Sequence, residues 1–265
     1  MFFFNFEEDK LKNYYLAYFD ILGYKSYFEN EKDPYEFLTV IEDALNDVKK
    51  GLSITQTLNK VKIGFRVYSD NFLFYITQDY DELSAIASFA YLLSLIQRRL
   101  LEKYSLLIRG GISKGKFFYN EELLFGKGLI DVYTLESKFA IYPRIIIDNS
   151  ENLFSKETLS TLYNTNYIEK DDDGYFYIQY LSAFGENDDY ITLKNNIKKL
   201  VNCNCRYRTM VDPNKIKEKE KLIAKYLWLV TRYNNYFDKV QLVDKKIDFI
   251  TTVHSKLLKV EVACK

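Results

Sequence analysis

The feature that most constrains the fold of this chain is a pair of carboxylates, each set at the end of an apolar run. Residues 17–28 read AYFDILGYKSYF, in which an apolar run carries Asp20 and breaks at a glycine. Residues 68–74 read YSDNFLF and place Asp70 between two further apolar runs. A central strand with a hairpin beside it would bring both carboxylates to one edge of a sheet. Paired carboxylates on rigid strand ends are suited to binding two divalent cations.

The order of the predicted elements indicates an α+β fold. Apolar runs bounded by turn residues indicate strands, and apolar residues at spacings of three and four indicate helices. The order β-α-β-β-α-β-α-β resembles a ferredoxin-like, split βαβ core (palm core, βαββαβ) with an added helix and strand. The predicted elements are residues 14–22, 34–48, 61–67, 72–76, 81–103, 106–118, 126–140 and 144–148.

Two further features belong to this predicted core. Residues 51–59 are rich in Ser and Thr and are predicted to form a loop. Gly110, Gly111 and Gly115 fall inside the strand predicted over residues 106–118. Glycines inside a strand indicate a bulge or the close approach of another backbone.

The character of the sequence changes beyond residue 149. Residues 155–162 predict a short helix and residues 167–180 a hairpin, and no Gly/Ser-rich linker separates the two halves. We therefore predict a core over residues 1–150 and a mainly helical extension, residues 151–265, that packs on it. The remaining predicted segments are residues 189–201, 214–237 and 247–258.

Composition limits the classes of function. The 265 residues are 48% hydrophobic, and 37 basic residues balance 37 acidic ones, so no bulk charge attracts nucleic acid or a membrane. Cys203, Cys205 and Cys264 are too few for a disulfide framework or a four-ligand zinc site, which indicates a cytoplasmic protein. The single histidine, His254, leaves carboxylates, cations and metals as the source of any chemistry.

Three segments together resemble the class III nucleotidyl cyclase domain, the fold of adenylate and guanylate cyclases. FDILGY is similar to that family's first strand, with Asp20 as its metal-binding aspartate. RVYSDNFLF is similar to its hairpin, in which Asp70 is the second metal aspartate, Arg66 takes the place of a base-contacting lysine, and Ser69 replaces the usual glycine. IRGGISKG and LFGKGLIDVYTLES are similar to its R-x-G-I-x-x-G strand and the following helix. The resemblance covers about residues 14–148.

The resemblance implies an enzyme that cyclises a nucleoside triphosphate with two Mg²⁺ or Mn²⁺ ions. Asp20, Asp70 and the carbonyl of Ile21 would hold the ions, and the ribose 3′-hydroxyl would displace pyrophosphate from the α-phosphate. Family sites form between two subunits, so the resemblance also implies a homodimer. A role in bacterial second-messenger or antiphage signalling would agree with it.

The chain departs from the family at two helix positions. Ile130 stands where the family has a ribose-orienting asparagine, and Thr134 where it has a transition-state arginine. Neither side chain can supply those interactions, so other cations must replace them. Leu123 stands where the family reads the purine, which leaves the base open. We assign catalysis to Lys138 and Arg109 and substrate binding to Arg66, Lys127 and Arg144.

Other interpretations remain open. Loss of the asparagine and arginine favours a lapsed cyclase-like domain that acts as a nucleotide-binding sensor or a scaffold, whereas retention of Asp20 and Asp70 favours an enzyme. A palm-type polymerase would use the same core, but zero net charge disfavours a basic template channel. In a purely structural interpretation, Asp20 caps a helix, Asp70 forms a turn, and the arginines make surface ion pairs.

Overall fold

The computed structural model describes residues 11–23, 34–150, 153–183, 190–204, 213–239 and 247. The chain divides into two compact units, and each is described by itself below. The first comprises Met1–Gln97 and Leu107–Ala183, and the second comprises Arg98–Leu106 and Phe184–Lys265.

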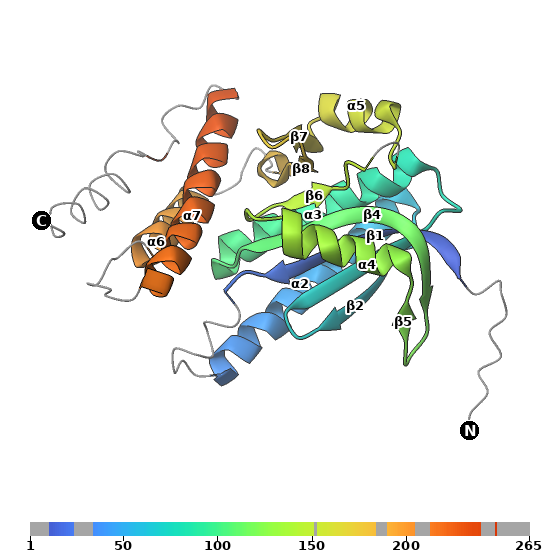
Figure 1. Cartoon of the computed structure of the whole chain (residues 1–265), viewed down its shortest axis with the longest axis horizontal. Helices are drawn as coiled ribbons and strands as arrows, with labels where there is room; N and C mark the ends of the chain where they lie inside the picture. The colour runs from blue at the N-terminus through green and yellow to red at the C-terminus, as the bar shows by residue number, and fades with distance from the viewer. Residues whose placement is uncertain are drawn as a thin grey trace, which may run out of the picture. The chain divides into compact units, whose positions relative to one another are not determined.

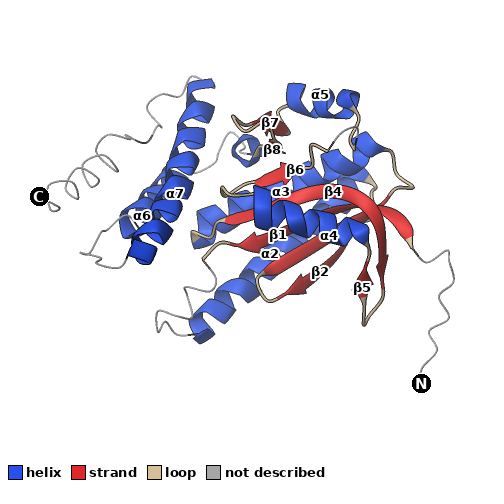
Figure 2. Ribbon diagram, in the orientation of Figure 1, coloured by secondary structure: helices blue, strands red, loops and turns tan. Residues whose placement is uncertain are grey.

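A mixed sheet forms the centre of the first unit (Figure 2). Strand β1 (Lys12–Ile21) lies between β3 (Asn71–Thr77) and β4 (Ile108–Tyr119) and is antiparallel to both. The full order in the described residues is β2-β3-β1-β4-β6-β8-β7, with β5 paired to β4. The other strands are β2 (Gly64–Tyr68), β5 (Leu124–Phe125), β6 (Ile145–Ile147), β7 (Ile168–Lys170) and β8 (Phe176–Ile178).

Helices lie on both sides of this sheet. In Figure 1, α4 (Lys127–Thr134) crosses in front of the sheet, and α2 (Pro34–Asn59) and α3 (Glu82–Tyr104) lie behind it. A π-helical turn, Leu135–Phe139, continues α4 and is called the π turn below. Helix α5 (Lys156–Asn164) follows β6. The predicted α+β fold, with its βαββαβ core and added elements, is therefore confirmed.

Both faces of β1 are buried, as its continuous apolar sequence predicts. Tyr14 and Leu16 pack in a cluster with Val132 of α4 on one face. On the opposite face, the ring of Phe19 stacks on Phe72 with 4.8 Å between the ring centroids. A strand buried on two sides holds the residues at its end in fixed positions, which matters for Asp20.

Glycines allow α4 to lie directly on β4. A Cβ atom added to Gly115 would come within 2.9 Å of the Gly128 backbone, so side chains at this crossing would force the helix away. Gly126, just before α4, has a φ of 139° and would place a Cβ 2.2 Å from the Lys116 carbonyl oxygen. The close backbone approach predicted for the glycines of this strand is confirmed at Gly115.

Two local predictions need correction. Residues 51–59 belong to α2 rather than to a loop, because Leu52 and Thr55 are buried and the Thr55 hydroxyl donates to the Gly51 carbonyl at 2.8 Å. The helix predicted over residues 126–140 changes to π geometry at Leu135. Strand β5 was not predicted from the sequence. The hairpin of β7 and β8 is confirmed, and β8 pairs with β6, so the first unit continues to Ala183, beyond residue 150.

The second unit contains α6 (Tyr190–Asn204), α7 (Pro213–Lys239) and the end of α3. These helices confirm the helical prediction for residues 189–201 and 214–237, and they bury apolar residues at helical spacing. The side-chain amide of Asn196 donates to the Leu101 carbonyl at 3.3 Å and ties α6 to the end of α3. The packing of the predicted extension on the core remains a prediction. The buried residues are Leu193, Ile197, Val201, Leu229, Tyr233 and Phe237.

Some sequence predictions fall on other parts of the chain. Of the segment predicted over residues 247–258, only Ile247 is described, and Cys205, His254 and Cys264 lie outside the described residues. No described helix combines the length and the apolar character needed to cross a bilayer.

Candidate functional site

Asp20 and Asp70 lie beside each other at one edge of the sheet. Asp20, near the end of β1, pairs in register with Asn71 on β3 and with Arg109 on β4. The amide of Ile21 donates to the Asp70 carbonyl at 3.2 Å and fixes the β2–β3 turn beside the end of β1. The structure thus brings Asp20, Ile21, Asp70 and Arg109 together. We call Asp20, Asp70 and the Ile21 carbonyl the carboxylate edge.

The turn that carries Asp70 is held in an unusual backbone conformation. Ser69 and Asp70 form the turn between the paired residues Tyr68 and Asn71, and Ser69 has a φ of 56°. Glycine adopts this left-handed conformation at low cost, which explains physically why a glycine suits this position. Ser69 adopts this conformation without being a glycine.

Arg109 is shared between two carboxylates. Its Nε and Nη2 donate to Oδ1 and Oδ2 of Asp20, each at 3.1 Å, and its Nη2 lies 2.7 Å from Oε1 of Glu136. The exposed fractions of the side chains are 25% for Arg109, 17% for Asp20 and 4% for Glu136. Arg109 is therefore a partly buried cation in direct contact with the carboxylate edge, rather than a surface ion pair.

Glu136 is a site residue that the sequence analysis missed. Burial, and then the negative charge of Asp20, raise the pKa of Glu136 to about 7, while Arg109 opposes the rise. Glu136 is four residues after the buried Val132 and next to the buried Leu135. A charged residue within the apolar stripe of a helix was the signal that could have found it.

A second chain of hydrogen bonds holds Asp70. The Tyr18 hydroxyl donates to Oδ1 of Asn71 at 2.6 Å, and Nδ2 of Asn71 donates to Oδ1 of Asp70 at 3.1 Å. Burial, followed by the charges of Glu136 and Asp20, raises the pKa of Tyr18, so its hydroxyl stays protonated and remains a donor at neutral pH. Tyr18 and Asn71 therefore orient the Asp70 carboxylate.

An apolar cavity of about 360 Å³ opens beside Tyr18, with Tyr68, Leu73, Ile130 and Tyr133 among its lining residues. We call it the tyrosine pocket. The rings of Tyr18 and Tyr133 meet edge to face, with centroids 5.8 Å apart. Its volume is in the range of small-molecule sites, and its tyrosines can contact a planar ring.

Arg66 lies next to this pocket on β2. It is the cross-strand partner of Leu73, which lines the pocket, and its Nη1 donates to the Phe65 carbonyl at 3.1 Å. Burial raises the pKa of Tyr68 and of Tyr75, and the positive charge of Arg66 lowers both. The guanidinium is thus near the pocket.

The other predicted cations lie elsewhere. Lys127 is 78% exposed and pairs with Asp131 at 2.6 Å. Lys138 is exposed and makes no hydrogen bond or ion pair with the side chains that the structure describes. Arg144 is fully buried and bonds to the carboxylates of Asp171 and Asp173. To bind substrate, Arg144 would have to leave those partners.

The two positions that depart from the family pattern offer no replacement chemistry. Ile130 is 65% exposed and apolar. The Thr134 hydroxyl donates to the Ile130 carbonyl at 2.7 Å, one turn back along α4. Neither side chain presents a free charge or a free hydrogen-bond donor.

The carboxylate edge fits a divalent cation only with help from a ligand. No three acidic, histidine or cysteine side chains among the described residues are grouped closely enough to hold a metal ion. Mg²⁺, however, is commonly held by one or two carboxylates together with substrate phosphates and water. The two carboxylates of the carboxylate edge match that arrangement.

Solved structures similar to this chain are adenylyl and guanylyl cyclases. The adenylyl cyclase CyaB from P. aeruginosa is 16% identical over 63% of this chain and 93% of its own, with a TM-score of 0.42. The guanylyl cyclase Cya2 is 17% identical over 68% of this chain and 96% of its own, with a TM-score of 0.40. The guanylate cyclase domain of RhGC from Catenaria anguillulae, in complex with GTP, is 13% identical over 63% and 96%, with a TM-score of 0.43.

At these identities the likeness concerns the fold alone. No protein-family model matches the chain, and no curated protein matches it.

Proposed function

We propose that this chain is a nucleotidyl cyclase that converts a nucleoside triphosphate to a cyclic nucleotide and pyrophosphate. The reaction would take place at the carboxylate edge with two Mg²⁺ or Mn²⁺ ions. One observation carries the proposal: Asp20 and Asp70 meet at the sheet edge, and each is oriented by its own side-chain partner. Metal-binding carboxylates are commonly oriented in this way by hydrogen-bonding neighbours.

In this proposal, Asp20, Asp70 and the Ile21 carbonyl are the protein ligands. When bound, the ions would lower the pKa of the ribose 3′-hydroxyl and neutralise charge on the triphosphate. The protein itself has to hold its carboxylates in position and align the hydroxyl with the α-phosphate. No histidine base is needed for this reaction.

Arg109 and Glu136 adjust the charge at Asp20. Without substrate, Arg109 neutralises Asp20. If Asp20 held a cation, Glu136 would keep the guanidinium paired, because it already lies 2.7 Å from Nη2. Arg109 would then stay close enough to the edge to stabilise negative charge on a phosphate.

The other cations take separate roles. We place the nucleobase or a phosphate beside Arg66, at the tyrosine pocket, and leave the identity of the base open. Lys138, exposed at the π turn, is the cation proposed to replace the arginine missing at Thr134. Lys127 remains a candidate for the triphosphate. We assign Arg144 to the fold, because it is fully buried against Asp171 and Asp173.

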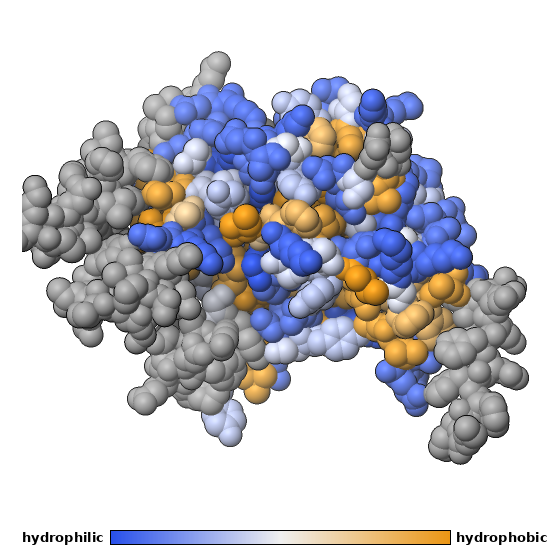
Figure 3. All heavy atoms as spheres, in the orientation of Figure 1, coloured by the Kyte–Doolittle hydropathy of each residue, from blue (hydrophilic) through white to orange (hydrophobic). Residues whose placement is uncertain are grey.

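The surface around α4 and β5 suits a second copy of the chain. Figure 3 shows apolar side chains gathered over β5 and the neighbouring part of α4. Contiguous exposed apolar surface is typical of an interface, and symmetric pairs are the commonest soluble oligomers. We propose a homodimer through this face. Its exposed apolar residues are Tyr68, Leu123, Phe125, Ile130 and Tyr133.

Product analysis tests the proposed reaction. Purified protein is incubated with ATP, GTP, CTP or UTP and Mn²⁺ or Mg²⁺, and the products are identified by mass spectrometry. We expect a cyclic nucleotide and pyrophosphate from the wild type and neither product from Asp20→Ala or Asp70→Ala. Thermal unfolding curves should show that all three proteins are folded. Asp79→Ala is the matched control, since this exposed carboxylate accepts a hydrogen bond from the Thr77 hydroxyl at the other end of β3. Wild-type turnover in either variant of the carboxylate edge would refute the two-metal assignment.

A lapsed cyclase-like domain is the second candidate. The observation that favours it is the Thr134 hydroxyl, which is satisfied within its own helix and offers nothing to a transition state. This candidate predicts that the wild type binds a triphosphate, or a protein partner, without forming any cyclic product.

A further inference from the structure

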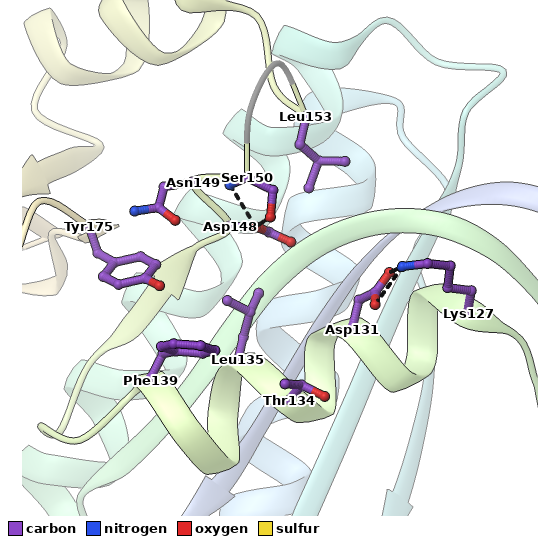
Figure 4. A pocket seen from close by; sticks show the side chains of 10 residues that line it. All are labelled: Lys127, Asp131, Thr134, Leu135, Phe139, Asp148, Asn149, Ser150, Leu153 and Tyr175. Carbon is purple, nitrogen blue, oxygen red and sulfur yellow. Dashed lines mark hydrogen bonds and ion pairs between the residues drawn. The ribbon is translucent and has the colours of Figure 1, made fainter.

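A second cavity, of about 390 Å³, lies between α4, the π turn, the end of β6 and the start of β8 (Figure 4). We call it the π-turn pocket. None of its lining residues belongs to the carboxylate edge or to the tyrosine pocket. Figure 4 shows Asp148 near the centre of the lining, with Phe139 and Tyr175 on one side and Asp131 and Lys127 on the other.

Asp148 is a fixed carboxylate in this pocket. The residue is 8% exposed. Its Oδ2 accepts a hydrogen bond from the Ser113 hydroxyl at 2.8 Å, and its Oδ1 accepts from the amide and hydroxyl of Ser150 at 2.9 and 2.5 Å. All three donors are neutral. They hold the carboxylate in place but do not balance its charge.

Two cations of the first unit, Lys127 in the lining and Arg144 just before β6, already have carboxylate partners. Lys127 pairs with Asp131, and both line the pocket. Arg144 bonds to Asp171 and Asp173. Among the described residues, no cation forms an ion pair with Asp148. Buried carboxylates are usually paired with a cation, so the pocket has an excess of negative charge.

The rest of the lining favours an organic cation over a metal ion. The rings of Phe139 and Tyr175 lie with centroids 6.1 Å apart at 42° to each other, and Leu135 and Leu153 add apolar surface. Aromatic faces attract ammonium groups, and aliphatic walls accept an alkyl chain. A metal ion needs more ligands, and no group of three suitable side chains occurs in the described part of the chain.

We propose that the π-turn pocket binds a small organic ammonium ion. Asp148 provides the anionic partner, and Phe139 and Tyr175 contact the ammonium group and its alkyl chain. Lys127, a candidate for the triphosphate, also lines this pocket. The proposal does not depend on cyclase activity, because Asp148, Phe139 and Tyr175 have no role in the proposed reaction.

The probe for this proposal is n-butylammonium chloride, with 1-butanol as its uncharged counterpart. Each is titrated into the full chain at constant ionic strength, and binding is followed by saturation-transfer NMR. We expect saturable binding of butylammonium. Butanol should bind at least about ten-fold more weakly, because the alcohol lacks the charge-assisted hydrogen bond.

Two variants locate the binding. Asp148→Asn keeps the size of the side chain and can still bond to Ser113 and Ser150, and we expect about a ten-fold loss of butylammonium affinity. Asp79→Asn is the matched control, since Asp79 also accepts a hydroxyl hydrogen bond, from Thr77 at 2.9 Å, but lies outside the pocket. It should bind like the wild type.

Tyr175→Leu keeps the proposal testable if Asp148→Asn fails to fold. Loss of the ring should weaken butylammonium binding several-fold while Asp148 remains. Three results would overturn the proposal: no saturable binding by the wild type, equal binding of butanol, or wild-type affinity in a folded Asp148→Asn or Tyr175→Leu protein.

Discussion

At the scale of single residues, the carboxylate edge depends on neighbouring groups that lie outside it. Asp20 receives its orientation from Arg109, and Asp70 receives it from Asn71, which is held in turn by Tyr18. The sequence indicated the two aspartates because each stands at the end of an apolar run. It did not indicate Tyr18 or Glu136, because their roles arise only from contacts between elements distant in sequence.

Tyr18→Phe tests the positioning of Asp70. The change removes the hydroxyl donor to Asn71 and keeps the ring, so we expect the Mn²⁺ affinity of the protein to fall about ten-fold, as is typical when a partner of a metal ligand is lost. The affinity is measured by isothermal titration calorimetry.

Tyr15→Phe is the matched control for this prediction. Tyr15 lies on the opposite face of the same strand, where its ring stacks on Phe154. A change in stability alone would appear in both variants. Unchanged Mn²⁺ affinity in folded Tyr18→Phe would contradict a positioning role for the hydroxyl.

At the scale of elements, the π turn is the feature that sequence periodicity could not predict. Apolar spacing predicts a single helix over residues 126–140, and the described helix changes to π geometry at Leu135, where the Ala140 amide donates to the Leu135 carbonyl at 2.8 Å. The π turn carries the buried Glu136. Such turns are frequent at functional sites. Similarly, the Ser/Thr-rich composition of residues 51–59 hid a helix whose inner face is buried.

Glu136→Gln tests the environment that the π turn creates. In the folded protein, burial and the negative charge of Asp20 raise the pKa of Glu136 to about 7 from its ordinary value of 4.5. The folded state therefore binds more protons than the unfolded state between these values, and the stability of the wild type should fall relative to Glu136→Gln as the pH rises from about 4.5 to about 7.

The measurement is urea unfolding of both proteins at pH 5 and pH 8, in EDTA. From pH 5 to pH 8, the free energy of unfolding of the wild type should fall relative to that of the variant by an amount on the order of 3 kcal/mol. An equal difference between the proteins at both pH values would show that the carboxyl is not perturbed.

At the scale of the whole molecule, the sequence predicted the core better than its borders. Alternation of apolar runs and helical spacing identified β1, β3, β4 and their connecting helices, because these elements are buried on a clear face. It placed the hairpin of β7 and β8 outside the core, because strands of three residues carry little pattern and their pairing through β6 is set by tertiary contacts. The two-residue strand β5 is equally short.

The central claim at this scale is that the chain holds divalent cations and a triphosphate together at the carboxylate edge. The most direct test is electron paramagnetic resonance of Mn²⁺ with wild type, Asp20→Ala and Asp70→Ala, with and without a triphosphate whose α–β bridge is a methylene group. We predict that the wild type binds Mn²⁺ together with the triphosphate and that both variants lose this binding while remaining folded. Equal Mn²⁺ binding by all three proteins would contradict the assignment of Asp20 and Asp70 as metal ligands.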